Sequence, residues 1–131
     1  MQPQLAVPLL RVADVARSAA WYRDALGFEV DPFPERPPYE FAILRHGPAE
    51  IMLRRGSEGR PASWRGWDVY VRLVGGLREL HAKLDTDGAV TRHLERMPYG
   101  DAEFDVRDPE GYVLCFSQVL TEVSDLPRPT V

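Results

Sequence analysis

Apolar and polar residues alternate along much of the chain, in short segments that turn residues separate. Alternation sends successive side chains to opposite faces of a strand, so it predicts strands with one apolar and one mixed face. Two segments instead carry apolar residues at helical spacing: residues 16–26, which lie between an N-cap at Asp14 and a stop at Gly27, and residues 77–84. Strands are predicted at residues 5–12, 28–30, 39–45, 50–55, 67–74, 90–96, 103–107 and 112–118.

The order strand–helix–strand–strand–strand occurs twice, and duplication on this scale is itself a signal of fold. We expect module one at about 5–55, a linker at 56–66, module two at about 67–118 and an irregular tail at 119–131. At 131 residues the chain is long enough for one domain and too short for two ordinary ones. The predicted fold is therefore a single α+β domain, in which two tandem βαβββ modules form curved mixed sheets around a cup.

The strand predicted at 67–74 has two unlike faces. Val69 and Val71 share the apolar face, whereas Asp68, Tyr70 and Arg72 share the other. The apolar face suits a helix. The mixed face suits either a cavity or ordinary solvent, and the pattern alone does not choose between them.

Composition and charge narrow the class of protein. The net charge of −4 gives no electrostatic reason for a nucleic-acid partner. No apolar run reaches the roughly 20 residues of a membrane span, so we expect a cytoplasmic protein with no membrane partner. One cysteine excludes an internal disulfide and a multi-cysteine zinc site. Residues 101–110 hold five carboxylates and one arginine, which favours a cationic ligand or, as the more frequent case, a solvated hairpin.

Two sets of motifs resemble the vicinal oxygen chelate superfamily of glyoxalases, extradiol dioxygenases and bleomycin resistance proteins. The opening signature is Asp14-Val-Ala-Arg-Ser18, Trp21-Tyr22 and Leu26-Gly27-Phe28, and the closing one is Met97-Pro-Tyr-Gly100, Phe104 and Asp108-Pro-Glu-Gly111. The likeness covers residues 5–118 and is greatest to the bleomycin-resistance type. It implies a homodimer, and unpaired sheet edges supply a physical motive for pairing.

In the metal enzymes of that superfamily, ligands come from the first, fifth and eighth strands, and the resemblance carries these positions to Val7, Asp68 and Cys115. Val7 has no donor atom, and one carboxylate with one thiol is a poor match for the oxygen and nitrogen sites of that chemistry. None of the three histidines shares a metal-binding spacing with another histidine or a glutamate. We therefore expect no catalytic metal and no cofactor. The histidines are His46, His81 and His93.

Cys115 could serve as a nucleophile, but that needs a lowered pKa and a nearby base, and the sequence places no histidine beside it. The favoured interpretation is a small residue in a pocket wall. We predict no catalytic residue.

The metal-free members of the superfamily bind small molecules without converting them, and we expect the same here, with an antibiotic as one candidate for a cationic or aromatic organic ligand. Asp68 is the carboxylate we place inside the pocket. The enzyme alternative is a lyase, isomerase or dioxygenase with unconventional metal ligands, or acid–base chemistry by Asp68 and Tyr70. Core packing is an open alternative for the residues Phe41, Met52 and Trp67. The predicted ligand-binding residues are Asp68, Tyr70, Tyr99, Trp67, Cys115, Val7, Phe41, Met52 and Tyr39.

Overall fold

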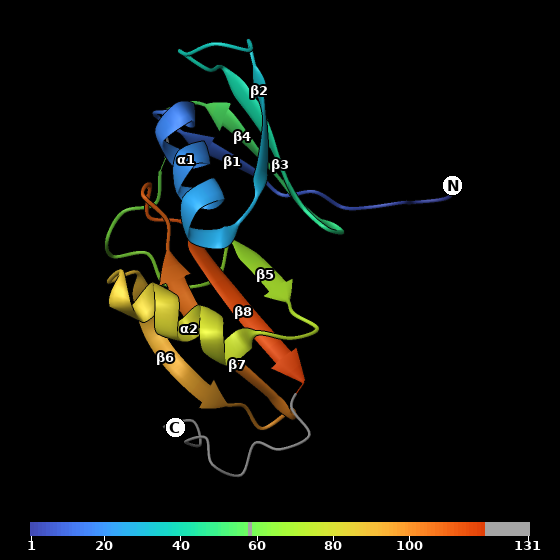
Figure 1. Cartoon of the computed structure of the whole chain (residues 1–131), viewed down its shortest axis with the longest axis vertical. Helices are drawn as coiled ribbons and strands as arrows, with labels where there is room; N and C mark the ends of the chain where they lie inside the picture. Colours follow the sequence, from blue (N-terminus) through green and yellow to red (C-terminus); the bar gives the residue numbers. More distant parts are fainter. Residues whose placement is uncertain (58, 120–131) are drawn as a thin grey trace. The chain divides into compact units, whose positions relative to one another are not determined.

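The structure is a computed structural model that describes residues 1–57 and 59–119. The chain divides into two compact units (Figure 1). The first holds the described residues up to Trp64 together with Pro109–Tyr112, and the second holds Arg65–Asp108 and residues 113–119. The predicted irregular tail lies outside the described residues except for Val119, which is the last residue of a strand.

Each unit contains one helix and one four-stranded sheet, which confirms the α+β class and the tandem βαβββ order. The first unit consists of β1 (Leu9–Val12), α1 (Val15–Leu26), β2 (Glu29–Phe33), β3 (Phe41–His46) and β4 (Ala49–Arg55). The second consists of β5 (Val69–Arg72), α2 (Leu77–Thr86), β6 (Val90–Arg96), β7 (Asp101–Arg107) and β8 (Val113–Val119). The cup between the modules, the single domain and the homodimer stay predictions.

Both sheets have the same mixed topology. Their strand orders are β1-β4-β3-β2 and β5-β8-β7-β6. In each sheet the first strand pairs parallel with the last, and the other pairs are antiparallel. The repeat seen in the sequence is therefore a repeat of topology.

Helix α1 begins and ends at the residues expected from the sequence. Oδ1 of Asp14 accepts a hydrogen bond from the backbone N–H of Arg17 at 3.0 Å, which is N-cap geometry. Gly27 ends the helix with φ of +77°, in the left-handed region that glycine adopts without strain. The buried face of the helix, which includes Tyr22 and Ala19, packs in the core of the first unit.

Several strand boundaries differ from the predicted ones. The first strand begins at Leu9 rather than residue 5, although the carbonyl of Pro8 still accepts the N–H of Met52 at 2.9 Å. The second continues through Pro32 to Phe33, whereas the predicted strand ends at residue 30. Because β2 is an edge strand, a proline there need not donate to a neighbour.

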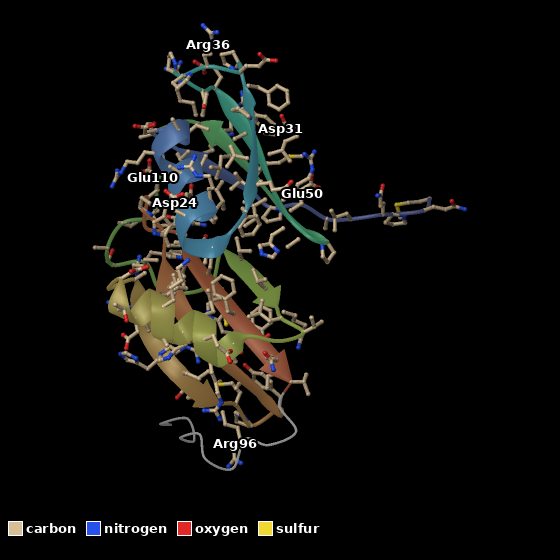
Figure 2. All side chains as sticks on the ribbon, viewed as in Figure 1. Asp24, Asp31, Arg36, Glu50, Arg96 and Glu110 are labelled. Carbon is tan, nitrogen blue, oxygen red and sulfur yellow. The ribbon has the colours of Figure 1, made fainter. Side chains whose placement is uncertain are left out.

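The closing turn Pro109–Tyr112 belongs to the first unit although β7 and β8 on either side belong to the second. Oε1 of Glu110 accepts the N–H groups of Ala13 at 2.7 Å and Asp14 at 3.3 Å, at the start of α1 (Figure 2). The hydroxyl of Tyr112 donates to the carbonyl of Arg11 at 2.6 Å. The turn thus ties down the beginning of the first helix.

None of the helices in the described part of the chain has the length and apolar character needed to cross a membrane.

Candidate functional site

The second sheet has an apolar face beneath α2 and a charged face opposite. On the α2 side, the rings of Phe104 and Phe116 stack with centroids 5.6 Å apart, and His81 of α2 lies 5.1 Å from Phe104. Because side chains alternate along a strand, Glu103 and Asp105 of β7 point to the other side. We call this other side, with the side chains that reach it, the polar face; its residues are Trp67, Tyr70, Arg72, Arg92, Glu95, Tyr99, Asp101, Glu103, Asp105 and Cys115.

Arg92 is the centre of the polar face. Its guanidinium donates to both oxygens of Asp105 at 2.8 and 2.9 Å, to Glu103 at 2.8 Å and to Glu95 at 2.9 Å. Burial opposes the charged form, but these hydrogen bonds outweigh it and raise the pKa of Arg92. The side chain of Glu103 is 0% exposed, so partners on this face must replace the water that it loses.

Two tyrosines bring their hydroxyls to Glu103. Tyr70 donates to Oε2 of Glu103 at 2.9 Å. Burial and the bond to Glu103 raise the pKa of Tyr70. Tyr99 lies on the turn after β6. Its pKa is raised mainly by partial desolvation and, as the second cause, by a hydrogen bond to Glu103. Both hydroxyls therefore stay protonated at neutral pH and act as donors.

An aromatic and cationic border lies beside these carboxylates. The ring of Trp67 is 5.0 Å from that of Tyr70 and 5.8 Å from the guanidinium of Arg92. Arg72 lies 5.4 Å from the ring of Tyr70 and forms a 2.7 Å ion pair with Asp101. Trp67 is nevertheless 46% exposed, so its ring can still contact a ligand.

Cys115 is fully buried in this face, paired with Tyr70 of β5 and Asp105 of β7. Burial raises the pKa of its thiol, and the charges of Asp105 and Glu103 raise it further. The guanidinium of Arg92 lies 3.6 Å from the sulfur of Cys115 and lowers the pKa of the thiol, but this effect is smaller than those that raise it. The environment therefore favours the protonated thiol, which is a weak nucleophile and a weak metal ligand.

The ligand set implied by the resemblance does not fit the metal of the superfamily's enzymes. Val7 offers no donor atom. Oδ2 of Asp68 accepts the backbone N–H of Val113 at 3.0 Å, so it holds the edge of the sheet. Burial favours the protonated thiol of Cys115, and the remaining carboxylates of the face are paired with arginine.

The structure brings together some of the predicted binding residues. The polar face includes Trp67, Tyr70 and Cys115. Tyr99 joins them because its hydroxyl is hydrogen-bonded to Glu103 of that face. Asp68 lies at its edge and is engaged with the backbone of β8.

The other predicted residues belong to the first unit. Phe41 and Met52 are half-buried on the face of the first sheet away from α1, and are not part of its buried core. Tyr39 is half-buried just before β3, and Val7 just before β1. Whether these four bind a ligand stays a prediction.

The structure changes the interpretation of three features of the sequence. The carboxylates of 101–110 are not a solvated hairpin, because Asp101 and Glu103 are buried. Core packing, the alternative left open for Trp67, does not describe this residue, because it is 46% exposed and its ring lies 5.0 Å from that of Tyr70. The histidines share no metal-binding spacing in the sequence, but the fold brings Nε2 of His81 within 3.4 Å of Nδ1 of His93.

Sequence reasoning missed the charged centre of the site. Asp101, Glu103 and Asp105 stand two residues apart, a period that puts all three on one face of β7. This spacing is the sequence signal from which the charged centre could have been predicted. The partner, Arg92, lies on β6 opposite Asp105, next to an irregularity in the pairing that no local pattern announces.

A cleft of about 320 Å³ in the first unit lies beside the β3–β4 turn, and none of the predicted binding residues lines it. It borders Arg45 and Glu50, an exposed ion pair. We place the candidate site on the polar face instead, because buried charge is concentrated there.

Two tandem βαβββ modules, each with one helix and one four-stranded mixed sheet, define a class of small α+β proteins. The chain belongs to the Glyoxalase/Bleomycin resistance protein/Dioxygenase superfamily, whose family model matches residues 4–116.

Solved structures share the fold. TioX from Micromonospora sp. ML1 is 26% identical with a TM-score of 0.74, over 90% of this chain and 100% of TioX. A lactoylglutathione lyase from Agrobacterium tumefaciens is 18% identical with a TM-score of 0.67, over 89% and 94% of the two chains. A glyoxalase-related enzyme from Clostridium phytofermentans is 14% identical with a TM-score of 0.73, over 92% and 98%. A comparison with curated protein sequences gave no match.

Proposed function

We propose that this protein binds a flat organic cation on the polar face of its second sheet and releases it unchanged. The observation that carries the proposal is the pairing of buried acid with an aromatic border. Four carboxylates face two guanidinium groups, so the face has an excess of negative charge. Trp67 and Tyr70 offer ring faces beside that charge, which is the arrangement that attracts cations.

Binding suits these side chains better than catalysis. A general base needs a pKa near neutrality and a free lone pair, but the hydroxyl of Tyr70 is a donor with a raised pKa. Asp68 accepts a backbone N–H, and the thiol of Cys115 stays protonated. The group with the most charge, Glu103, is already bonded to Arg92 and Tyr70.

Membership of a superfamily named in part for bleomycin resistance supports an antibiotic as the ligand. A homodimer would suit such a protein, since a second copy can complete a shallow sheet face.

The test is a thermal-shift and calorimetric screen of bleomycin and other aromatic cations, each beside a neutral analogue of the same ring system. We expect a cation to raise the melting temperature and its neutral analogue to do so much less. Trp67→Ala should weaken binding by roughly tenfold, the loss of one cation–ring contact.

The matched control is Phe33→Ala, because Phe33 is also 46% exposed but lies in the first unit. It should leave affinity unchanged. Neutral analogues that bind as well as the cations, or a Trp67→Ala chain with undiminished affinity, would contradict the proposal. Turnover of any bound compound would contradict the statement that the ligand is released unchanged.

A further inference from the structure

Three side chains that can bind a metal converge on the α2 side of the second sheet. His81 and Asp85 are four residues apart on α2, so they project from the same side of the helix. His93 comes from β6, the edge strand beside that helix. This group is separate from the polar face, because His81 packs on Phe104 while Glu103 and Asp105 point the opposite way.

The distances fit one small ion. Nε2 of His81 lies 3.4 Å from Nδ1 of His93, and Nδ1 of His93 lies 3.9 Å from Oδ1 of Asp85. All three donor atoms lie within 4.8 Å of one another. Zinc–nitrogen bonds of about 2.0–2.1 Å in a tetrahedral site put two imidazole nitrogens about 3.4 Å apart.

The facing ring nitrogens of the two histidines have a geometry that a shared cation would satisfy. Nε2 of His81 accepts the backbone N–H of Leu94 at 3.4 Å, so this nitrogen carries no proton, and a bound ion would take the place of that long hydrogen bond. Without a cation between the rings, either one facing nitrogen carries a proton or two lone pairs oppose each other.

The donor set indicates the kind of metal. Two imidazole nitrogens and one carboxylate are a common three-residue set for zinc, with water in the fourth position. Calcium and magnesium prefer oxygen ligands throughout. The side chains of His93 and Asp85 are 69% and 50% exposed, so an ion can reach the site from solvent.

We propose that His81, Asp85 and His93 bind one zinc ion that links α2 to the edge strand β6. The ion would hold the helix against the strand farthest from β5 in the sheet order. It has no part in the proposed binding of organic cations on the opposite face.

The test is a titration of the chelator-treated, full-length chain with zinc alone, followed by calorimetry and a competing metal-sensitive dye. We expect one zinc per chain and a melting temperature that rises with zinc. His93→Gln should weaken zinc binding by roughly 100-fold or more, because even the outer partners of metal ligands change affinity by about 10–100-fold. Asp85→Asn should weaken it less, and cobalt in place of zinc should give the intense visible absorption of a tetrahedral site.

His46→Gln is the matched control, because it removes the one remaining histidine, in the first unit, and should bind zinc as the unchanged chain does. Circular dichroism without metal establishes that the variants fold, which the exposure of His93 and Asp85 favours. The proposal is overturned if zinc does not bind saturably, if His93→Gln and His46→Gln bind alike, or if the cobalt spectrum is that of a hydrated surface ion.

Discussion

The hydrogen bonds of Arg92 compensate the buried charge of Glu103 in the second unit. One guanidinium serves Glu95, Glu103 and Asp105, and its own side chain is only 28% exposed. Taking a carboxylate such as Glu103 out of water costs several kcal/mol unless partners replace the lost hydration. Arg92 and Tyr70 are those partners, so the stability of this face depends on them.

Replacing Arg92 with methionine keeps the apolar stem and removes the charge. We expect the free energy of unfolding to fall by about 3 kcal/mol, because breaking a buried pair leaves Glu103 uncompensated. Urea unfolding followed by circular dichroism measures the loss.

The control is Arg45→Met on the first sheet. Arg45 pairs with Asp31 at 3.5 Å and with Glu50 at 3.1 Å, two residues labelled in Figure 2. Its side chain is 49% exposed. Exposed pairs contribute less than about 1 kcal/mol. Equal losses in the two variants would show that burial is not what makes Arg92 important.

Among the elements, the closing turn stands out because glycine is required there for two separate reasons. Gly111 has φ of +87°, and a Cβ on it would overlap the backbone carbonyl of Arg60. That segment is itself bonded to the turn, since the N–H of Arg60 donates to the carbonyl of Glu110 at 3.0 Å. The linker predicted at 56–66 therefore packs against the turn.

We expect Gly111→Ala to lower the free energy of unfolding by clearly more than the roughly 1 kcal/mol that a left-handed backbone costs alanine. The excess comes from moving the backbone at Arg60. Gly88→Ala measures the cost of the left-handed backbone alone, because Gly88 has φ of +78° and a Cβ added there would meet no neighbouring atom. Denaturation curves of the two variants should separate, and coinciding midpoints would remove the steric argument.

At the scale of elements, the sequence predicted both helices and eight strands because periodicity and caps are local. It placed β1 and β2 poorly, since pairing across the sheet decides where a strand begins and whether Pro32 is tolerated. It missed the site's charged centre for a similar reason. The three acids of β7 share a period of two, but only the fold shows that Arg92 meets them.

The whole molecule consists of two units of the same topology, and the chain leaves and re-enters the first one. Because residues 109–112 complete the first unit from within the second half of the sequence, we expect both units to unfold together, as a single domain would. Hydrogen exchange should give matching maximal protection in β4 and β8, and tryptophan fluorescence should follow the same urea transition as circular dichroism. A β4 that exchanges while β8 is still protected would mean two independent domains.

The position of Glu110 in the sequence also matters while the protein is being made. A ribosome delivers α1 early, but the carboxylate that binds the N–H groups of Ala13 and Asp14 is synthesised close to a hundred residues later. For most of translation, the first module therefore lacks the carboxylate of Glu110 that binds the start of α1. In that period its unpaired strand edges can pair with other chains. An amino-terminal fragment that ends in the linker would never acquire Glu110, so the start of its α1 would stay without these two hydrogen bonds.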